Sequence, residues 1–141
     1  MKYVMVYWSR TGINKKIVES LSEILKKKGA ETQILKTDEA DPCSMPDADV
    51  YVFSAPTEAF RIQKDMRFFL KKITGLQGKK YAVINTHGMK RNWVSSMKKV
   101  LENKQMDFLA SVDFKVEKNN DKKLELPSDW EQTLSDFSAK L

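Results

Sequence analysis

Apolar residues follow two different spacings along this chain, and the spacing changes several times from one end to the other. Short runs rich in β-branched and aromatic residues are typical of buried strands. Between and after these runs, apolar residues recur every three or four positions, as on the buried face of a helix. The pattern predicts strands over residues 3–7, 32–35, 50–54, 81–85 and 108–116, and helices over 17–25, 66–73, 94–101 and 130–141.

Strands that alternate with helices predict an α/β domain with a parallel sheet. Because crossovers are right-handed, few strand orders remain, and we expect a doubly wound five-stranded parallel sheet of order 2-1-3-4-5 with helices on both faces. That order opens a crevice above the carboxyl ends of the first and third strands. The loops over residues 8–14, 55–61 and 86–93 are expected to line it. Residues 1–141 are expected to form a single domain.

Two local features complete the expected fold. The last helix follows Pro127, and Ser128 is its expected N-cap. The polar and charged segment 117–123 is expected to form a turn.

The composition narrows the class of protein. Cys43 is the only cysteine among 141 residues, which excludes an intrachain disulfide and a cysteine-rich zinc site. No apolar run approaches the length of about 18 residues that a membrane span needs. No cleavable signal pattern precedes the first predicted strand. We therefore expect a cytoplasmic protein, either a monomer or a weak dimer.

Charge is unevenly distributed along the chain, whose formal net charge is +6. Six acidic and no basic residues lie between residues 37 and 58, whereas residues 60–105 hold twelve basic residues against two acidic ones. Such blocks form either solvated faces or surfaces that attract a partner of opposite charge. The basic region 61–104 is thus the candidate surface for an acidic partner protein, with peripheral membrane contact as an alternative. Nucleic acid is not expected, because no reader motif is present.

The first predicted strand runs directly into a hydroxyl-rich turn and then into a helix. A turn that opens a helix directs unpaired backbone N–H groups and the positive end of the helix dipole at whatever lies above the strand. Ser9, Thr11 and Asn14 add side-chain donors, and Gly12 allows close approach of the backbone. This combination favours a bound phosphate.

With the three loops in view, the whole chain resembles the flavodoxin family, a known example of the 2-1-3-4-5 strand order. The first loop, Ser9-Arg10-Thr11-Gly12-Ile13-Asn14, is similar to the family's phosphate-binding turn, Ser/Thr-x-Thr-Gly-Asn-Thr. The resemblance implies that this loop holds the phosphate of FMN. Ile13 and Asn14 depart from the family's usual Asn and Thr. Like short-chain flavodoxins, the chain has no insertion in its fifth strand.

The other two loops carry the rest of the resemblance and most of the departures. Ser54-Ala55-Pro56-Thr57 is similar to the family's Ser-Pro-Thr segment, but Glu58 and Ala59 stand where glycine is frequent. Since a Cβ disfavours positive φ, these residues are expected to resist that conformation. The resemblance implies cofactor-binding residues in these two loops, namely Pro56, Thr57, Glu58, Ala59, Phe60, Thr86, His87, Gly88, Asn92 and Trp93.

Several of these side chains have an alternative structural interpretation. Phe60 and Trp93 are candidates to stack on the flavin ring, but Trp93 also fits the core face of the helix that follows it. His87, the only histidine, is interpreted as a proton donor, a cofactor contact or a structural residue. Arg10 either contacts the phosphate or points to solvent.

The resemblance implies an FMN-binding electron carrier in which the protein orients the flavin and sets its potential. Lys90 and Arg91 contrast with the acidic surroundings of the flavin in typical flavodoxins and would raise the potential. One alternative is a flavin-dependent reductase of quinones or small substrates, and another is a flavin-free interaction domain. A phosphoacceptor receiver, a tyrosine phosphatase and a dinucleotide-binding fold are excluded because their required residues are missing.

Overall fold

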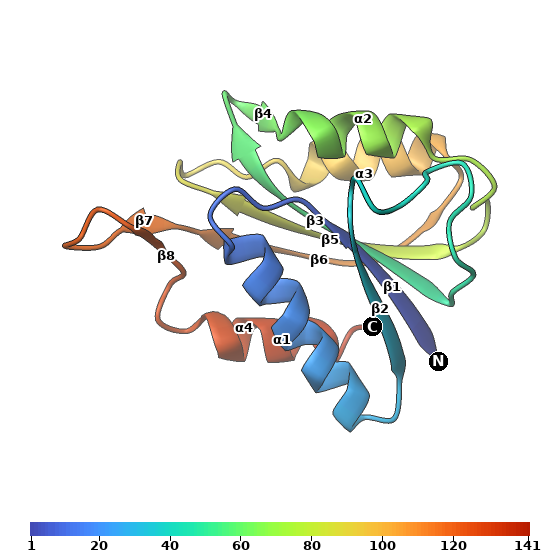
Figure 1. The fold of residues 1–141 in the computed structure, drawn as a ribbon, viewed down its shortest axis with the longest axis horizontal. Helices are drawn as coiled ribbons and strands as arrows, with labels where there is room; N and C mark the ends of the chain where they lie inside the picture. Colours follow the sequence, from blue (N-terminus) through green and yellow to red (C-terminus); the bar gives the residue numbers. More distant parts are fainter.

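The computed structural model describes residues 1–141 and contains five parallel strands in one twisted sheet (Figure 1). Their order is β2-β1-β3-β5-β6, which confirms the predicted order 2-1-3-4-5 of the long strands. Each strand begins and ends within a few residues of its expected position. The bounds are β1 Lys2–Tyr7, β2 Glu31–Lys36, β3 Val50–Glu58, β5 Lys80–His87 and β6 Asp107–Lys115.

Helices cover both faces of the sheet, as predicted. Helices α1 (Ile13–Lys27) and α4 (Trp130–Ser138) pack together on one face, and α2 (Lys64–Lys72) and α3 (Val94–Asn103) pack together on the other (Figure 1). The alternating side chains of the central strands build one apolar core on each face. In β1, for example, Val4 and Val6 face α2 and α3, whereas Met5 faces α1 and α4.

Three of the connections between the long strands contain a helix, but the connection between β2 and β3 does not. Residues 37–49 form turns and irregular backbone without a helix. Met45 and Ala48 of this segment pack into the core on the α2 and α3 face. The face above β1 and β2 is therefore covered by a thin, irregular segment, and a hollow remains beside it.

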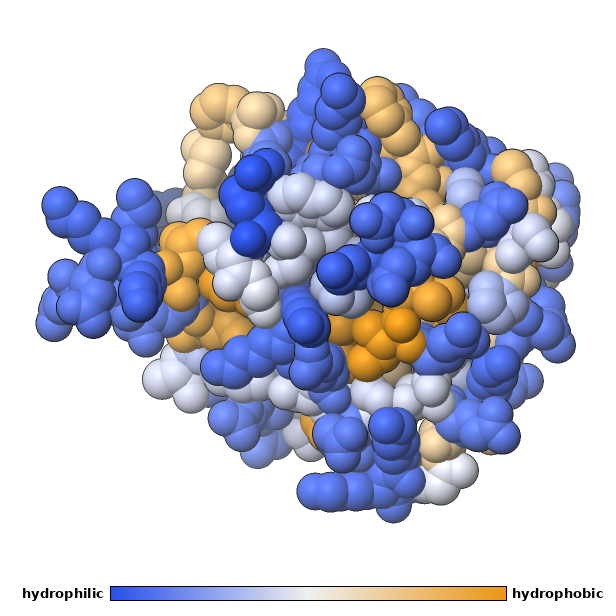
Figure 2. Space-filling model, in the orientation of Figure 1, coloured by the Kyte–Doolittle hydropathy of each residue, from blue (hydrophilic) through white to orange (hydrophobic).

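The structure adds three short strands that the sequence pattern does not predict. Strand β4 (Arg61–Ile62) forms an antiparallel hairpin with the end of β3. Strands β7 (Glu117–Lys118) and β8 (Leu124–Glu125) form a second hairpin, so the expected turn over 117–123 is wrong at its first two residues. This hairpin projects from one end of the molecule and is hydrophilic at its tip (Figure 2).

The expected N-cap of the last helix is also wrong. Helix α4 begins at Trp130, and its N-cap is Asp129, whose side chain accepts no capping hydrogen bond. The Trp130 N–H instead donates to the carbonyl of Pro127, so a backbone turn leads into the helix. None of the four helices combines the length and the apolar composition that a membrane crossing requires.

Candidate functional site

A crevice lies at the carboxyl ends of β1, β3 and β5, where the predicted strand order places it. It encloses about 240 Å³. Most of the residues expected from the sequence line it, together with two that the sequence did not indicate, Val116 and Leu124. The lining consists of Arg10, Thr11, Ile13, Asn14, Pro56, Thr57, Glu58, Thr86, His87, Gly88, Val116 and Leu124.

The first loop presents an unpaired run of backbone N–H groups at the start of α1. Gly12 adopts φ 89°, a left-handed conformation that is unfavourable for residues other than glycine. Its N–H donates to Ser9 Oγ. The N–H groups of Arg10, Thr11 and residues 13–15 have no acceptor within the protein. The first turn of α1 contains no acidic residue. The geometry therefore suits an anion such as a phosphate.

Asn14 lies in the first turn of α1, and its side chain connects this helix to β3 and β5. Its side chain is buried, its Nδ2 donates to Thr86 Oγ1 at 3.0 Å, and its Oδ1 accepts from Ser54 Oγ at 2.8 Å. Both ends of the amide are thus engaged within the protein. Contact between this side chain and a ligand stays a prediction.

Arg10 bridges the first and second loops. Its Nε and one terminal nitrogen donate to the two carboxylate oxygens of Glu58 at 2.7 and 2.8 Å. This hydrogen bond raises the pKa of Arg10, and the nearby Glu58 charge acts in the same direction. The guanidinium also lies 5.0 Å from the ring centroid of Trp8. The guanidinium of Arg10 is therefore paired with the Glu58 carboxylate, although Arg10 still lines the crevice.

The second loop forms the tip of the hairpin between β3 and β4. Glu58 pairs with Arg61, so Ala59 and Phe60 are the two central residues of the turn. Their φ angles are 50° and 62°. The expectation that Ala59 avoids positive φ is therefore wrong, because a two-residue hairpin turn of this hand requires positive φ at both positions. Phe60 is 67% exposed and, like Ala59, does not line the crevice.

Asn85, at the end of β5, holds the second and third loops together. Its Nδ2 donates to the Ala55 carbonyl and to Thr57 Oγ1, both at 3.1 Å, and its Oδ1 accepts from the Trp93 N–H at 2.9 Å. Asn85 is fully buried. Asn85 is the last residue of the predicted strand 81–85, and no sequence motif marks it as a residue that connects two loops.

The third loop directs its expected residues to different places. Asn92 accepts a hydrogen bond from the Val94 N–H at the start of α3. Trp93 is half-buried, packs against the core and lines a groove between α2 and α3. Only Thr86, His87 and Gly88 of this loop face the crevice.

His87 is held between two oxygen acceptors. One ring nitrogen faces the Met89 carbonyl, and Nε2 lies 2.6 Å from a carboxylate oxygen of Asp113 in β6. Since a carbonyl and a carboxylate both accept, the ring donates to both only when both nitrogens are protonated. Asp113 is twenty-six positions away in the sequence and was not predicted. The pairing fixes the start of the third loop.

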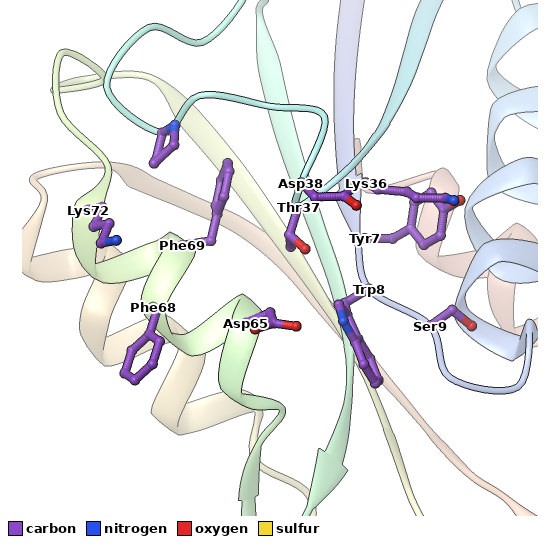
Figure 3. Close-up of a pocket in the computed structure, with 11 residues that line it drawn as sticks. Tyr7, Trp8, Ser9, Lys36, Thr37, Asp38, Asp65, Phe68, Phe69 and Lys72 are labelled. Carbon is purple, nitrogen blue, oxygen red and sulfur yellow. The ribbon is translucent and has the colours of Figure 1, made fainter.

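A second, larger hollow of about 520 Å³ lies between the end of β1 and α2 (Figure 3). Trp8 and Ser9 contribute from the first loop, and α2 contributes Asp65, Phe69 and Lys72. The remaining lining residues are Tyr7, Lys36, Thr37, Asp38, Pro42 and Phe68. The lysines and aspartates balance in charge, and none of them forms an ion pair. This hollow occupies the side of the sheet where the connection between β2 and β3 lacks a helix.

The residues of the crevice fit the phosphate of FMN. Three features favour an anion there: the free N–H groups, the lack of acidic residues in the first turn of α1 and the left-handed Gly12. The cavity is smaller than the usual 300–1,000 Å³ of ligand sites, so the fit concerns the phosphate and not the whole cofactor.

One family model matches the chain, and solved structures share its fold. A family model described as "Flavodoxin domain" matches residues 4–120. No curated protein matches the chain. The solved structures similar to it include a flavodoxin from Streptococcus pneumoniae TIGR4, with a TM-score of 0.81 and 16% identity, covering 100% of this chain and 97% of that one.

Two further structures show the same fold. Oxidised flavodoxin 1 from Bacillus cereus has a TM-score of 0.79 and 16% identity, covering 99% of this chain and 96% of that one. Rubredoxin oxygen:oxidoreductase from Desulfovibrio gigas has a TM-score of 0.79 and 19% identity over 99% of this chain but only 34% of its own length. The shared fold therefore occurs both as a separate chain and as part of a larger protein.

Proposed function

The chain belongs to the flavodoxin family, and from that premise we propose that it binds FMN in the three-loop crevice and acts as a cytoplasmic electron carrier. The observation that carries the proposal is the run of free backbone N–H groups at the start of α1. Bound FMN would supply the one- and two-electron chemistry, which no side chain of the protein provides.

The protein's own residues would bind and orient the cofactor. The N–H groups of the first loop would hold the phosphate, with Ser9 maintaining the turn through its bond to Gly12. The hairpin tip at Ala59 and Phe60 and the third loop from Thr86 to Trp93 would flank the ring. Lys90 and Arg91 of the third loop are exposed cations. Positive charge beside the ring would stabilise added electrons and raise the reduction potential.

Visible absorbance of the purified protein, before and after addition of FMN and desalting, tests this proposal. We expect flavin absorbance to remain with the protein after desalting. A protein that stays colourless after loading would contradict FMN binding and favour the flavin-free interaction domain. The Arg10–Glu58 pair and the small cavity are the features that would support that alternative.

We further propose that the basic region 61–104 receives an acidic redox partner. Electron carriers dock through small surfaces, and opposite charge accelerates their association. Oxidation of the reduced, FMN-loaded protein by anionic ferricyanide should slow as salt is added, whereas oxidation by cationic hexaamminecobalt(III) should not. Equal salt dependence for the two reagents would argue against a basic docking surface beside the flavin.

The second candidate function is a flavin-dependent reductase of a quinone or another small substrate. The hollow beside Trp8 favours it, because about 520 Å³ lies within the usual volume range of small-molecule sites. A reductase of this kind would oxidise NADH or NADPH with a soluble quinone as acceptor and no second protein. Turnover that requires a carrier protein would instead support the electron-transfer function.

A further inference from the structure

Helices α2 and α3 lie on the face of the sheet opposite α1 and α4 (Figure 1). An open groove lies between α2 and α3. Ile62, Leu70 and Met97 are buried and form its floor, and Trp93 and Val100 are half-buried beside them. The groove encloses about 240 Å³. The apolar floor suits apolar side chains entering from another molecule.

The rim of the groove is basic. Arg61, Arg67 and Lys71 line it, and no acidic residue does. None of these three side chains forms an ion pair. Arg67 donates to the Ile62 carbonyl and lies 5.5 Å from the Phe68 ring centroid, so it remains positive without a counter-charge. The rim therefore carries an unneutralised positive field around an apolar floor.

The groove adjoins the second and third loops, which also border the crevice. Arg61 and Ile62 form β4, directly after the turn at Ala59 and Phe60. Trp93 reaches the groove from the third loop, where its N–H donates to Asn85. A molecule seated between α2 and α3 would consequently lie beside the second and third loops.

We propose that this groove docks an acidic segment of a partner protein, which inserts an apolar side chain onto the floor and directs carboxylates at Arg61, Arg67 and Lys71. The apolar floor distinguishes a protein segment from nucleic acid, whose phosphates gain nothing from Leu70 or Met97. The concave shape between two helices does not match the flat surface of a bilayer. The role of the partner in electron transfer rests on the proposed function, whereas the docking itself does not.

The test measures binding of a short synthetic peptide of aspartate and glutamate with a central leucine–phenylalanine pair. Calorimetry is performed on the wild type and on the double variant Arg61→Glu/Lys71→Glu. The matched control is Lys27→Glu/Lys140→Glu, which changes the net charge equally at exposed positions near the other face. Val100→Ser tests the apolar lining beside the floor. FMN absorbance after loading is recorded for every variant.

We expect the groove variant to bind the peptide about tenfold more weakly, or not at all, and the control to bind nearly as well as the wild type. Val100→Ser and a peptide with serines in place of its apolar pair should each weaken binding several-fold. Equal losses in the groove variant and the control, or no effect of the apolar pair, would show a general polyanion effect and overturn the proposal. Tighter binding of oligouridylate or anionic vesicles through the same groove residues would also overturn it. Peptide docking without FMN retention would support the groove and reject the proposed function.

Discussion

At the scale of single residues, the most consequential contact is the pair formed by Arg10 and Glu58. Glu58 places a negative charge on the crevice and pairs with Arg10, the one arginine that lines it. Replacing Glu58 by glutamine should tighten FMN binding by about two- to tenfold, because it removes repulsion and frees Arg10 for a forked contact. Quenching of FMN fluorescence on titration measures the change.

The control for this prediction is Glu19→Gln. Glu19 forms an exposed ion pair with Lys15 in α1, at 3.9 Å, and does not line the crevice. The substitution therefore removes the same charge away from the proposed site. It should leave the affinity for FMN nearly unchanged. If Glu58→Gln binds FMN more weakly than the wild type, the pair is needed to shape the crevice and our interpretation of Glu58 is wrong.

Asn14 shows what a sequence can and cannot say about one residue. Its position in a phosphate-type turn was predictable, but its burial between Ser54 and Thr86 depends on how α1 packs against β3 and β5. Asn14→Ala should destabilise the protein by about 1–3 kcal/mol, because two buried hydroxyls lose their partner. Urea unfolding of the FMN-free protein measures this. A loss of FMN affinity with unchanged stability would mean that the side chain serves the ligand instead.

At the scale of elements, the turn between β3 and β4 carries backbone strain. Ala59 and Phe60 both have positive φ, although neither is a glycine or an asparagine. Ala59→Gly should stabilise the folded protein by about 0.5–1 kcal/mol, since relief of the strain exceeds the extra entropy of the unfolded chain. Ala40→Gly, at a position without positive φ, should be neutral or destabilising. Chemical denaturation that shows the same loss for both variants would exclude strain at the turn.

A strand or helix could be predicted only where it is long enough for its apolar residues to show a regular spacing. The five long strands and four helices each contain enough residues for the apolar spacing to appear, and all nine are present. Strand β4 has only Arg61 and Ile62, too few for any alternation to be recognised. Asp113 could not be predicted for another reason. Its pairing with His87 depends on the register between β5 and β6, which no local sequence pattern encodes.

At the scale of the whole molecule, the sheet buries a tyrosine whose ionisation opposes folding at high pH. Burial raises the pKa of Tyr81 from 10.0 to about 12, and the charge of Glu102 adds to the effect. Between these values the unfolded chain releases the phenolic proton while the folded protein retains it. The associated stability is complete below pH 10 and is lost as the pH rises through about 12.

Tyr81→Phe should therefore flatten the alkaline part of the stability curve. The difference in slope corresponds to about 2 kcal/mol of stability lost by the wild type between pH 10 and 12. The variant also lacks the hydrogen bond from Tyr81 to the Lys98 carbonyl, so its curve should start lower at neutral pH. The test compares the free energies of unfolding of the wild type and the variant between pH 10 and 12. If both decline with the same slope, ionisation of Tyr81 does not oppose folding.

The global arrangement was the most predictable level of the structure. Alternation of strands and helices, with the right-handed crossover rule, left few strand orders, and the expected order 2-1-3-4-5 places the crevice at the ends of β1 and β3. What could not be predicted was the hollow beside Trp8, because it results from the irregular course of residues 37–49 over the sheet. Nothing in the composition of that segment specifies how closely it approaches α2.

The contacts of His87 make this residue a built-in reporter of the crevice. The chain contains one histidine, so a proton NMR spectrum of the unlabelled protein contains the signals of a single imidazole ring. That ring lies 2.6 Å from Asp113 at one nitrogen and lines the crevice. Its chemical shifts can therefore follow rearrangement of the third loop during a titration, without isotopes, resonance assignment or an attached dye.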